Sequence, residues 1–210
     1  MSQNTSKEHI EVKREAVPTY PVVAIRELVA NMMVHQDFAI NGMPLTIEIF
    51  ENRLTFTNPG SSLNDVNRLI DLPPHSRNEA MAQMMLLLDM CERRGSGYDR
   101  ATDAIAQMKL PAYKAQSGND YTRVTLFPKK KVGEMTRDER IAVCYQHACL
   151  LYEDSLSINN QRVRERFSLN TKQSAMASRI LSDTMESGLI KMENPETESK
   201  RYTSYIPFYG

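Results

Sequence analysis

The sequence has 210 residues, of which 41% are hydrophobic and 25% charged, an ordinary composition for a soluble globular protein with a buried core. Basic and acidic residues balance at 26 each, so the overall charge gives no sign of a nucleic-acid or membrane partner, and any basic surface must be local. No apolar run is long enough to span a bilayer, and the first residues lack a signal-peptide core. We therefore expect a cytoplasmic protein without membrane contact.

The cysteines support a reducing compartment. Cys91, Cys144 and Cys149 are an odd number without metal-binding or redox spacing. Each falls in a segment with a helical pattern. We expect free thiols that are buried or half-buried.

The clearest domain boundary follows a strand-like run at 121–127, where a proline, three lysines and a glycine precede a helix signal. The lysines can be a solvated linker or a specific binding site, and the sequence favours the linker. The division that follows is an N-terminal extension at 1–19, a first domain at 20–128, a linker at 129–134 and a second domain at 135–210.

The first domain has the pattern of an α+β fold. A helix is predicted at 21–34, where Pro21 suits the first turn. Two strands around the turn at Glu51-Asn52-Arg53 form a hairpin. This order predicts helices that cover one face of a mostly antiparallel sheet. The strands are predicted at 45–50, 54–57 and 121–127, and further helices at 63–70, 78–90 and 98–108.

The first helix carries polar side chains in an otherwise apolar sequence. Glu27, Asn31 and His35 recur every four residues and share one face, and Asp37 follows directly. This periodicity fits a solvent-facing stripe as well as a ligand site. Two glycine-bearing loops downstream favour the ligand site.

The two loops are Asn58-Pro59-Gly60, after a strand, and Gly95-Ser96-Gly97, before a helix. Glycines at a helix N-terminus let backbone N–H groups approach a phosphate, which the helix dipole also attracts. An amide oxygen such as that of Asn31 suits Mg²⁺, and a carboxylate such as Glu27 can polarise a water for attack on a phosphate. The pattern therefore predicts a nucleotide–Mg²⁺ site.

These residues resemble, in order and spacing, the ATP-binding C-terminal module of the RecG-like helicase-related bacterial transcriptional regulators. That module is similar to the GHKL ATPases (gyrase B, histidine kinases and MutL). The resemblance covers roughly residues 20–127 and is specific only as a set of motifs. The set comprises Tyr20-Pro21, Arg26-Glu27-Leu28, Asn31, His35-Gln36-Asp37-Phe38, Ile47-Glu48-Ile49-Phe50, Asn58-Pro59-Gly60, Ser76-Arg77-Asn78, Glu92-Arg93-Arg94-Gly95-Ser96-Gly97 and Tyr121-Thr122-Arg123-Val124-Thr125-Leu126.

The resemblance implies a GHKL-like, Bergerat-type α/β sandwich that binds ATP and Mg²⁺, with Glu27 as catalytic base and Asn31 as metal ligand. Asn58 stands where GHKL enzymes have Asp, Ser61 where the family has Gly, and the lid is short, so the sequence favours nucleotide binding over turnover. The cofactor-binding residues that it implies are Asn31, His35, Asp37, Asn58, Gly60, Gly95, Ser96 and Gly97.

Proteins of this family commonly carry an N-terminal Schlafen/AlbA-like domain. The sequence does not display one, so we expect the C-terminal part of such a protein or a family member without that domain. The chain has no P-loop motif, and we do not expect a helicase.

The second domain has the order of a winged helix-turn-helix. Thr136 and Glu139 form a capping box. A second helix starts at Asn159 or Asn160, a third at Thr171, and Gly188 ends it. Strand-like runs at 189–193 and 200–205 follow. We predict that the third helix buries Met176, Ile180, Leu181 and Met185.

Basic residues concentrate in the helix-turn-helix, where Arg162, Arg164, Arg166, Lys172 and Arg179 face one acid, Glu165. This distribution is typical of phosphate contact, with base readout at the start of the third helix. The predicted DNA-binding residues are Arg162, Arg164, Thr171, Lys172, Gln173, Ser174, Arg179 and, on the wing, Lys200 and Arg201.

Three functions remain open. The first is a transcriptional regulator whose nucleotide occupancy modulates DNA binding, which requires that ATP prefer one arrangement of the domains. The second is a slow Mg²⁺-dependent ATPase that uses Glu27. The third is a nucleotide-free scaffold whose winged helix mediates protein–protein assembly. Aromatic residues near the C-terminus (Tyr202, Tyr205, Phe208 and Tyr209) could also support a homodimer.

Overall fold

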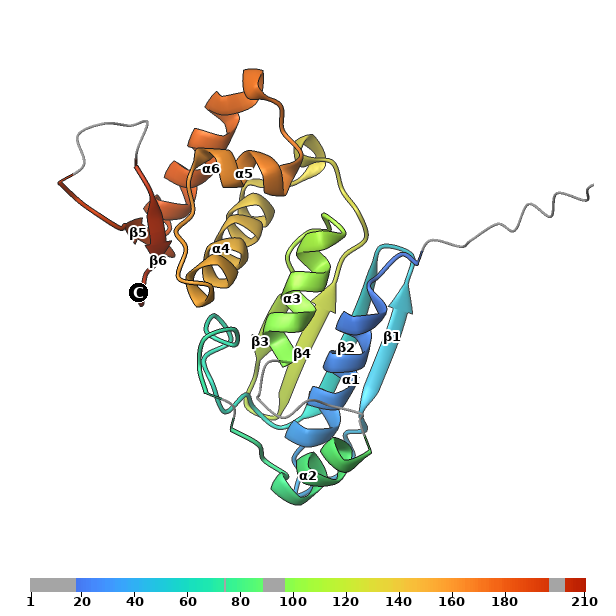
Figure 1. Ribbon diagram of the computed structural model, residues 1–210. Helices are drawn as coiled ribbons and strands as arrows, with labels where there is room; N and C mark the ends of the chain where they lie inside the picture. Colours follow the sequence, from blue (N-terminus) through green and yellow to red (C-terminus); the bar gives the residue numbers. More distant parts are fainter. Residues whose placement is uncertain (1–17, 74, 89–96, 197–202) are drawn as a thin grey trace, which may run out of the picture.

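The computed structural model describes residues 18–73, 75–88, 97–196 and 203–210, which form two packed halves (Figure 1). The N-terminal half is a sheet with helices on one face. The C-terminal half is mainly helical and carries a small hairpin near the end of the chain. No helix in the described ranges has the length and apolar character to cross a membrane.

The sheet is antiparallel throughout and confirms the predicted hairpin. Its order is β1-β2-β4-β3, so β2 and β4 are central. Ile47 of β1 lies opposite Phe56 of β2, and Phe56 lies opposite Val124 of β4. The short edge strand β3 has the sequence KAQS, without apolar alternation, and was not predicted. The strands are β1 (Thr46–Phe50), β2 (Arg53–Pro59), β3 (Lys114–Ser117) and β4 (Tyr121–Leu126).

Helices α1 (Val22–His35) and α3 (Gly97–Gln107) lie side by side on one face of the sheet. They bury small and apolar side chains against Phe56 and its neighbours, which is the main source of stability in this half. Helix α2 (Glu79–Leu87) packs across the end of α1 through Met85. The observed layers agree with the predicted α+β class.

The helix predicted at 63–70 is wrong, because this stretch forms turns. The Asp65 side chain accepts a hydrogen bond from the Asn67 N–H at 2.9 Å, and Arg68 pairs with Asp71 at 2.5 Å. Such local side-chain bonds compete with helix formation. Ile70, 7% exposed, packs into the core of the C-terminal half, a tertiary contact that the local sequence does not reveal.

The C-terminal half follows the predicted order of elements. Thr136 and Glu139 form the expected capping box, and Asn159 caps the second helix by accepting from the Arg162 N–H. An isolated bridge joins Ile158 to Tyr205 beside the hairpin. The elements are η1 (Val132–Glu134), α4 (Arg137–Glu153), α5 (Asn160–Phe167), η2 (Thr171–Gln173), α6 (Ser174–Glu186), β5 (Ile190–Met192) and β6 (Tyr205–Pro207).

The prediction that Met176 and Met185 are core residues is wrong, since each is 37% exposed. Ile180 and Leu181 are buried as predicted. The buried face of α6 also includes Ala177 and Thr184, and the Thr184 hydroxyl is satisfied by the Ile180 carbonyl at 2.7 Å. Ala177 and Thr184, and not the two methionines, therefore complete the buried face of α6. The strand predicted at 200–205 begins only at Tyr205 and runs to Pro207.

Cys144 and Cys149 are buried free thiols, as predicted, and Cys91 lies outside the described residues. Burial raises the pKa of Cys144 to about 12 and that of Cys149 to about 11. Both thiols are therefore protonated and unreactive at neutral pH.

The two halves make polar contacts as well as apolar ones. The Arg166 guanidinium, in a residue only 5% exposed, donates to the Leu110 carbonyl at 2.7 Å. Lys109 donates to the Glu165 carbonyl at 3.0 Å. Arg166, one of the basic residues counted in the predicted helix-turn-helix, thus forms a bond across the junction between the halves.

Candidate functional site

A cavity of about 290 Å³ lies between α1, the central strands, α2 and the loop that follows β2. This volume is close to the lower end of the range typical of small-molecule sites. Apolar side chains such as Leu28, Phe56 and Leu72 form part of its wall. The polar lining consists of Glu27, Asn31, His35, Asn58, Ser62, Asn64, His75, Ser76, Gln83, Tyr98 and Thr122.

The polar face of α1 points into this cavity rather than to solvent. Glu27 is only 3% exposed, and Asn31 and His35 line the same space one and two turns further on. Burial and the neighbouring Arg77 lower the pKa of His35, so this imidazole is neutral at pH 7. A solvent-facing stripe, the alternative interpretation of the periodicity, does not fit these positions.

Glu27 and Asn31 are packed against the first residue of α3. A Cβ on Gly97 would lie 3.3 Å from both Glu27 Oε2 and Asn31 Nδ2, so only glycine leaves this corner open. The other Glu27 oxygen, Oε1, is 3.0 Å from the Arg100 guanidinium. This ion pair holds the buried carboxylate in place and balances its charge. No local pattern identifies Arg100 as a site residue, because its partner Glu27 lies on another helix.

Asn58 approaches the cavity from the end of β2. It is 5% exposed, and its Nδ2 donates to the Pro59 carbonyl at 3.0 Å. This bond fixes the amide and leaves its oxygen as the atom that can accept from a ligand amine. The predicted adenine-side role of Asn58 is sterically consistent with this position.

Two predicted ligand residues, Asp37 and Gly60, do not line the cavity. Arg77 donates to the Asp37 carboxylate at 3.1 Å, to the His35 carbonyl at 3.2 Å and to the Ser61 carbonyl at 2.9 Å. Gly60 has φ +98°, and a Cβ there would lie 2.9 Å from Asp37 Cβ, so glycine is required. These residues fasten the end of α1 to the loop after β2 and support the site from outside.

The remaining predicted cofactor-binding residues, Gly95 and Ser96, lie outside the described residues, as do Lys200 and Arg201 on the predicted wing. The described residues suit a nucleotide with Mg²⁺ on chemical grounds. Glu27 and Asn31 offer hard oxygen donors, and Asn31 Nδ2 is a buried atom without a hydrogen-bond partner among the described residues.

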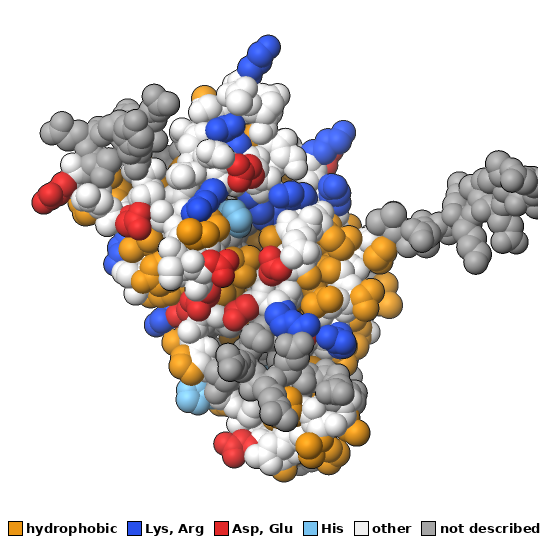
Figure 2. Space-filling view, viewed as in Figure 1, with side chains coloured by type: hydrophobic (Ala, Val, Ile, Leu, Met, Phe, Trp, Pro, Cys, Tyr) orange, Lys and Arg blue, Asp and Glu red, His pale blue; other side chains and the backbone are white. Residues whose placement is uncertain are grey.

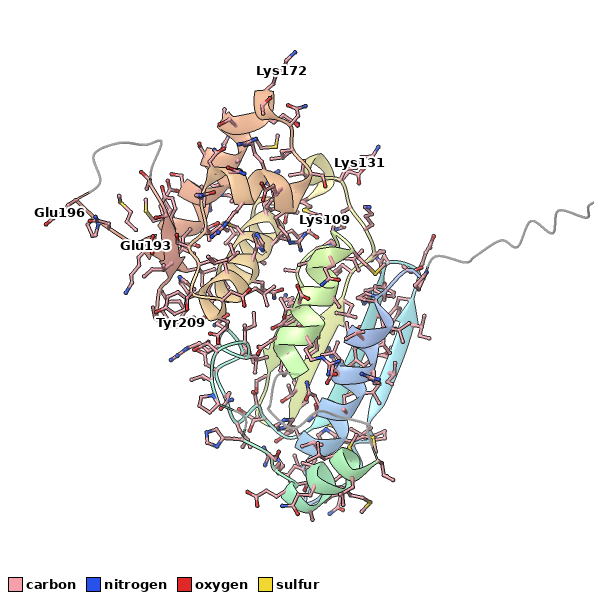
Figure 3. The ribbon with its side chains drawn as sticks, viewed as in Figure 1. Lys109, Lys131, Lys172, Glu193, Glu196 and Tyr209 are labelled. Carbon is pink, nitrogen blue, oxygen red and sulfur yellow. The ribbon has the colours of Figure 1, made fainter. Side chains whose placement is uncertain are left out.

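We call residues 61–73 and 75–77, between β2 and α2, the bridging loop, because they contact both halves. Several of its side chains line the cavity, among them Ser62 and Leu72. From the same loop, the Asn67 carbonyl accepts from the Tyr145 hydroxyl at 2.6 Å, and the Arg68 guanidinium lies 4.7 Å from the Tyr209 ring centre. Figure 3 shows Tyr209 next to this loop.

The predicted DNA-binding residues of the C-terminal half differ in exposure and in their partners. Arg162 donates to the Ser157 carbonyl, and Arg164 donates to Asn160 Oδ1 at 3.0 Å, so both are held by their own domain. Gln173 is partly buried. The others are exposed on η2 and α6, and they are Thr171, Lys172, Ser174 and Arg179.

Comparison with known proteins supports an ATPase-like module in the N-terminal half. Residues 42–126 match the family described as "Putative ATP-dependent DNA helicase recG C-terminal". This range contains β1 to β4, α2 and α3, and it includes Asn58 and Gly97. It does not include α1, so the assignments of Glu27 and Asn31 depend on their geometry. No curated protein matches the chain.

A solved structure extends the likeness to both halves. The chain is similar to the crystal structure of the DIP2311 protein from Corynebacterium diphtheriae, with 17% identity and a TM-score of 0.53. The alignment covers 92% of this chain and 42% of that one, so the chain spans about two fifths of the length of this relative. At this level of identity the likeness concerns the fold alone.

Proposed function

We propose that the chain is an ATP-binding regulator that engages DNA through a C-terminal winged helix, with nucleotide occupancy of the cavity modulating that engagement. The observation that carries this proposal is the bridging loop. Its side chains line the cavity, and its Ile70 is part of the C-terminal core. A ligand that repositions this loop acts on both halves at once.

In this proposal, the cavity between α1, the central strands, α2 and the bridging loop holds the nucleotide. Asn58 faces the adenine, and Asn31 supplies an oxygen to Mg²⁺. Gly97, at the N-terminal end of α3, leaves room for the phosphates, and the helix dipole favours their charge there. Bound Mg²⁺ neutralises charge on the phosphate oxygens.

The C-terminal half supports the DNA-binding part. The order α4, α5, α6 and then a hairpin, with a bridge between Ile158 and Tyr205, is typical of winged helices. Lys172 in η2, and Ser174 and Arg179 in α6, are exposed, and the first of these residues lie near the start of α6, the position from which recognition helices contact base edges. Protein–protein assembly through the same helix is the alternative that a DNA-binding measurement separates.

The experiment is a calorimetric titration of the chain with Mg²⁺-ATP, alongside Asn31→Ala and a matched control, Asn52→Ala. Asn52 carries the same side chain on the exposed turn between β1 and β2. We expect micromolar binding that Asn31→Ala weakens at least tenfold, about 1.4 kcal/mol, and that Asn52→Ala leaves unchanged. No heat at millimolar ATP would contradict the proposal and favour the nucleotide-free scaffold.

Slow ATP hydrolysis is a second candidate, favoured by the position of Glu27. Its carboxylate is buried, lines the cavity and lies beside both Asn31 and Gly97, where a base could orient a water. Glu27→Gln should abolish phosphate release and retain ATP binding. Wild-type release no faster than the background would exclude this activity and leave the binding proposal intact.

A further inference from the structure

A second hollow, of about 500 Å³, lies at the junction between the two halves. We call it the junction groove. Its walls come from three places, which are Lys109 after α3, the linker and the start of the C-terminal half, and the end of α5 with the turn after it. The lining residues are Lys109, Lys129, Lys130, Lys131, Val132, Glu134, Met135, Arg166, Phe167, Ser168, Leu169 and Gln173. The groove therefore contains side chains from both halves and from the linker between them.

The lining of the junction groove is strongly basic. It contains four lysines and one arginine, against a single acid, Glu134. Lys109 and Arg166 donate to neutral backbone carbonyls, which leaves their charges uncancelled. Lys130 pairs with Glu139 at 2.5 Å, whereas Lys129 and Lys131 are exposed and form no salt bridge within the described residues.

The positive charges of this region also lower the pKa of a neighbouring histidine, His147. The pKa of His147, on α4, is lowered to about 4, mainly by burial and then by Arg166, Lys109 and Arg162 in that order, while Glu165 acts in the opposite direction. These three cations come from two different halves of the chain. Their charges thus converge on one place, as a site for an anion requires.

The basic side chains continue from the groove toward α6. In Figure 2, Lys and Arg side chains gather across the upper part of the molecule, over α5 and the linker. Figure 3 shows Lys172 projecting from the top of the molecule and Lys131 projecting to the right from the linker. Gln173, next to Lys172, is itself in the lining. A polyanion that reaches the start of α6 would therefore pass over the junction groove.

The spacing of the two unpaired lysines favours a nucleic-acid backbone. Lys129 and Lys131 are alternate residues of an irregular segment whose Lys131 is extended, so their backbones lie at most about 7 Å apart. One strand of duplex DNA carries a charge about every 3.4 Å of its axis. Each lysine can thus meet a different phosphate, and the flexible lysine stem suits such point contacts.

We propose that the junction groove binds the phosphate backbone of DNA through Lys109, Lys129 and Lys131, so that both halves of the chain contact one duplex. These phosphate contacts do not depend on the base sequence, and the DNA affinity that they add decreases as the salt concentration rises. The identity of the ligand rests on the DNA binding proposed above, but the residues differ from those of α6.

The test measures affinity for a short fluorescently labelled duplex DNA by anisotropy, using the full chain, from about 50 to about 200 mM salt. The variant is Lys129→Gln with Lys131→Gln. The matched control, Arg26→Gln with Lys114→Gln, removes two exposed charges from α1 and β3. A third variant, Lys172→Gln with Arg179→Gln, probes α6.

We expect the groove variant to bind at least tenfold more weakly at low salt. The slope of log affinity against log salt should become shallower by about 1.8, which is two phosphate contacts at about 0.9 each. The control should match the wild type. This result would establish the groove contact even if the α6 variant behaved normally, in which case only the proposed role of α6 would fail.

Three outcomes would overturn the groove proposal. A wild-type slope in the groove variant, with weaker binding only in the α6 variant, would restrict DNA contact to α6. Displacement of the duplex by polyglutamate at equal charge concentration would make the groove a general polyanion surface. Absence of any duplex binding at low salt would overturn both this proposal and the proposed DNA binding.

Discussion

Gly97, the first residue of α3, lies against the polar face of α1, and it gives a sharp substitution test of the site. In Gly97→Ala the new Cβ would lie 3.3 Å from Glu27 Oε2 and Asn31 Nδ2, displacing both groups by a few tenths of an ångström. We expect ATP affinity to fall about tenfold, or about 1.4 kcal/mol. The free energy of unfolding should change by less than about 1 kcal/mol, because alanine suits a helix.

The control for this prediction is Gly133→Ala, where a Cβ would meet nothing within 4 Å. Affinity is measured by calorimetry and stability by urea unfolding of the same samples. Equal ATP affinity in Gly97→Ala and Gly133→Ala would show that the corner formed by Glu27, Asn31 and Gly97 does not contact the nucleotide.

His147 makes stability depend on pH. Burial is the main cause that lowers its pKa from 6.5 to about 4, so between these values the unfolded chain binds a proton that the folded chain does not. Stability therefore falls as the pH falls from 6.5 toward 4, by up to about 3 kcal/mol. His147→Gln should lose less stability over this window, as measured by urea unfolding at several pH values. An identical pH dependence in the variant would refute this account.

At the scale of elements, the bridging loop is held in position by packing of Ile70 into the C-terminal core. Ile70 is 7% exposed within that core, whereas Leu63 of the same loop is 49% exposed. Ile70→Ala should reduce the free energy of unfolding by about 2–4 kcal/mol, since it leaves a cavity. Leu63→Ala should cost less than about 1 kcal/mol. Equal losses in urea unfolding would mean that the loop does not pack into the core.

Elements with local signals could be predicted from the sequence. The β1–β2 hairpin, the capping box of α4 and the cap of α5 follow from residues close together in the chain. The bridging loop could not, because distant partners in the C-terminal half hold it in place, and no local pattern distinguishes an apolar residue such as Ile70 that packs against another part of the chain. Strand β3 pairs with the adjacent β4, but its sequence lacks the apolar alternation by which a strand is recognised.

The candidate site, like the fold, could be predicted only in part from the sequence. The four-residue spacing of Glu27, Asn31 and His35 predicted a shared face, and that face does line the cavity. Arg77 and Arg100, which fix Asp37 and Glu27, were not assigned these roles, since their partners lie on separate elements. Spacing along one helix can be read from a sequence, whereas ion pairs between elements require the fold.

At the scale of the whole molecule, the central feature is the connection between the cavity and the C-terminal half. The bridging loop packs into the C-terminal core through Ile70, and the junction groove is lined by residues of both halves. A nucleotide that prefers one position of the loop would change the population of C-terminal arrangements by its difference in affinity for them. Such a coupling would allow a nucleotide in the cavity to regulate α6, which it does not contact.

Hydrogen–deuterium exchange with and without Mg²⁺-ATP tests this claim most directly, because it reports on both halves in one experiment. We predict slower exchange in α1 and α3 around the cavity, and also in the bridging loop and the part of α4 that contacts it through Tyr145. The Asn31→Ala chain should lose all of these changes together. Protection confined to α1 and α3, with α4 unchanged, would contradict the coupling, and no protection at millimolar ATP would contradict nucleotide binding itself.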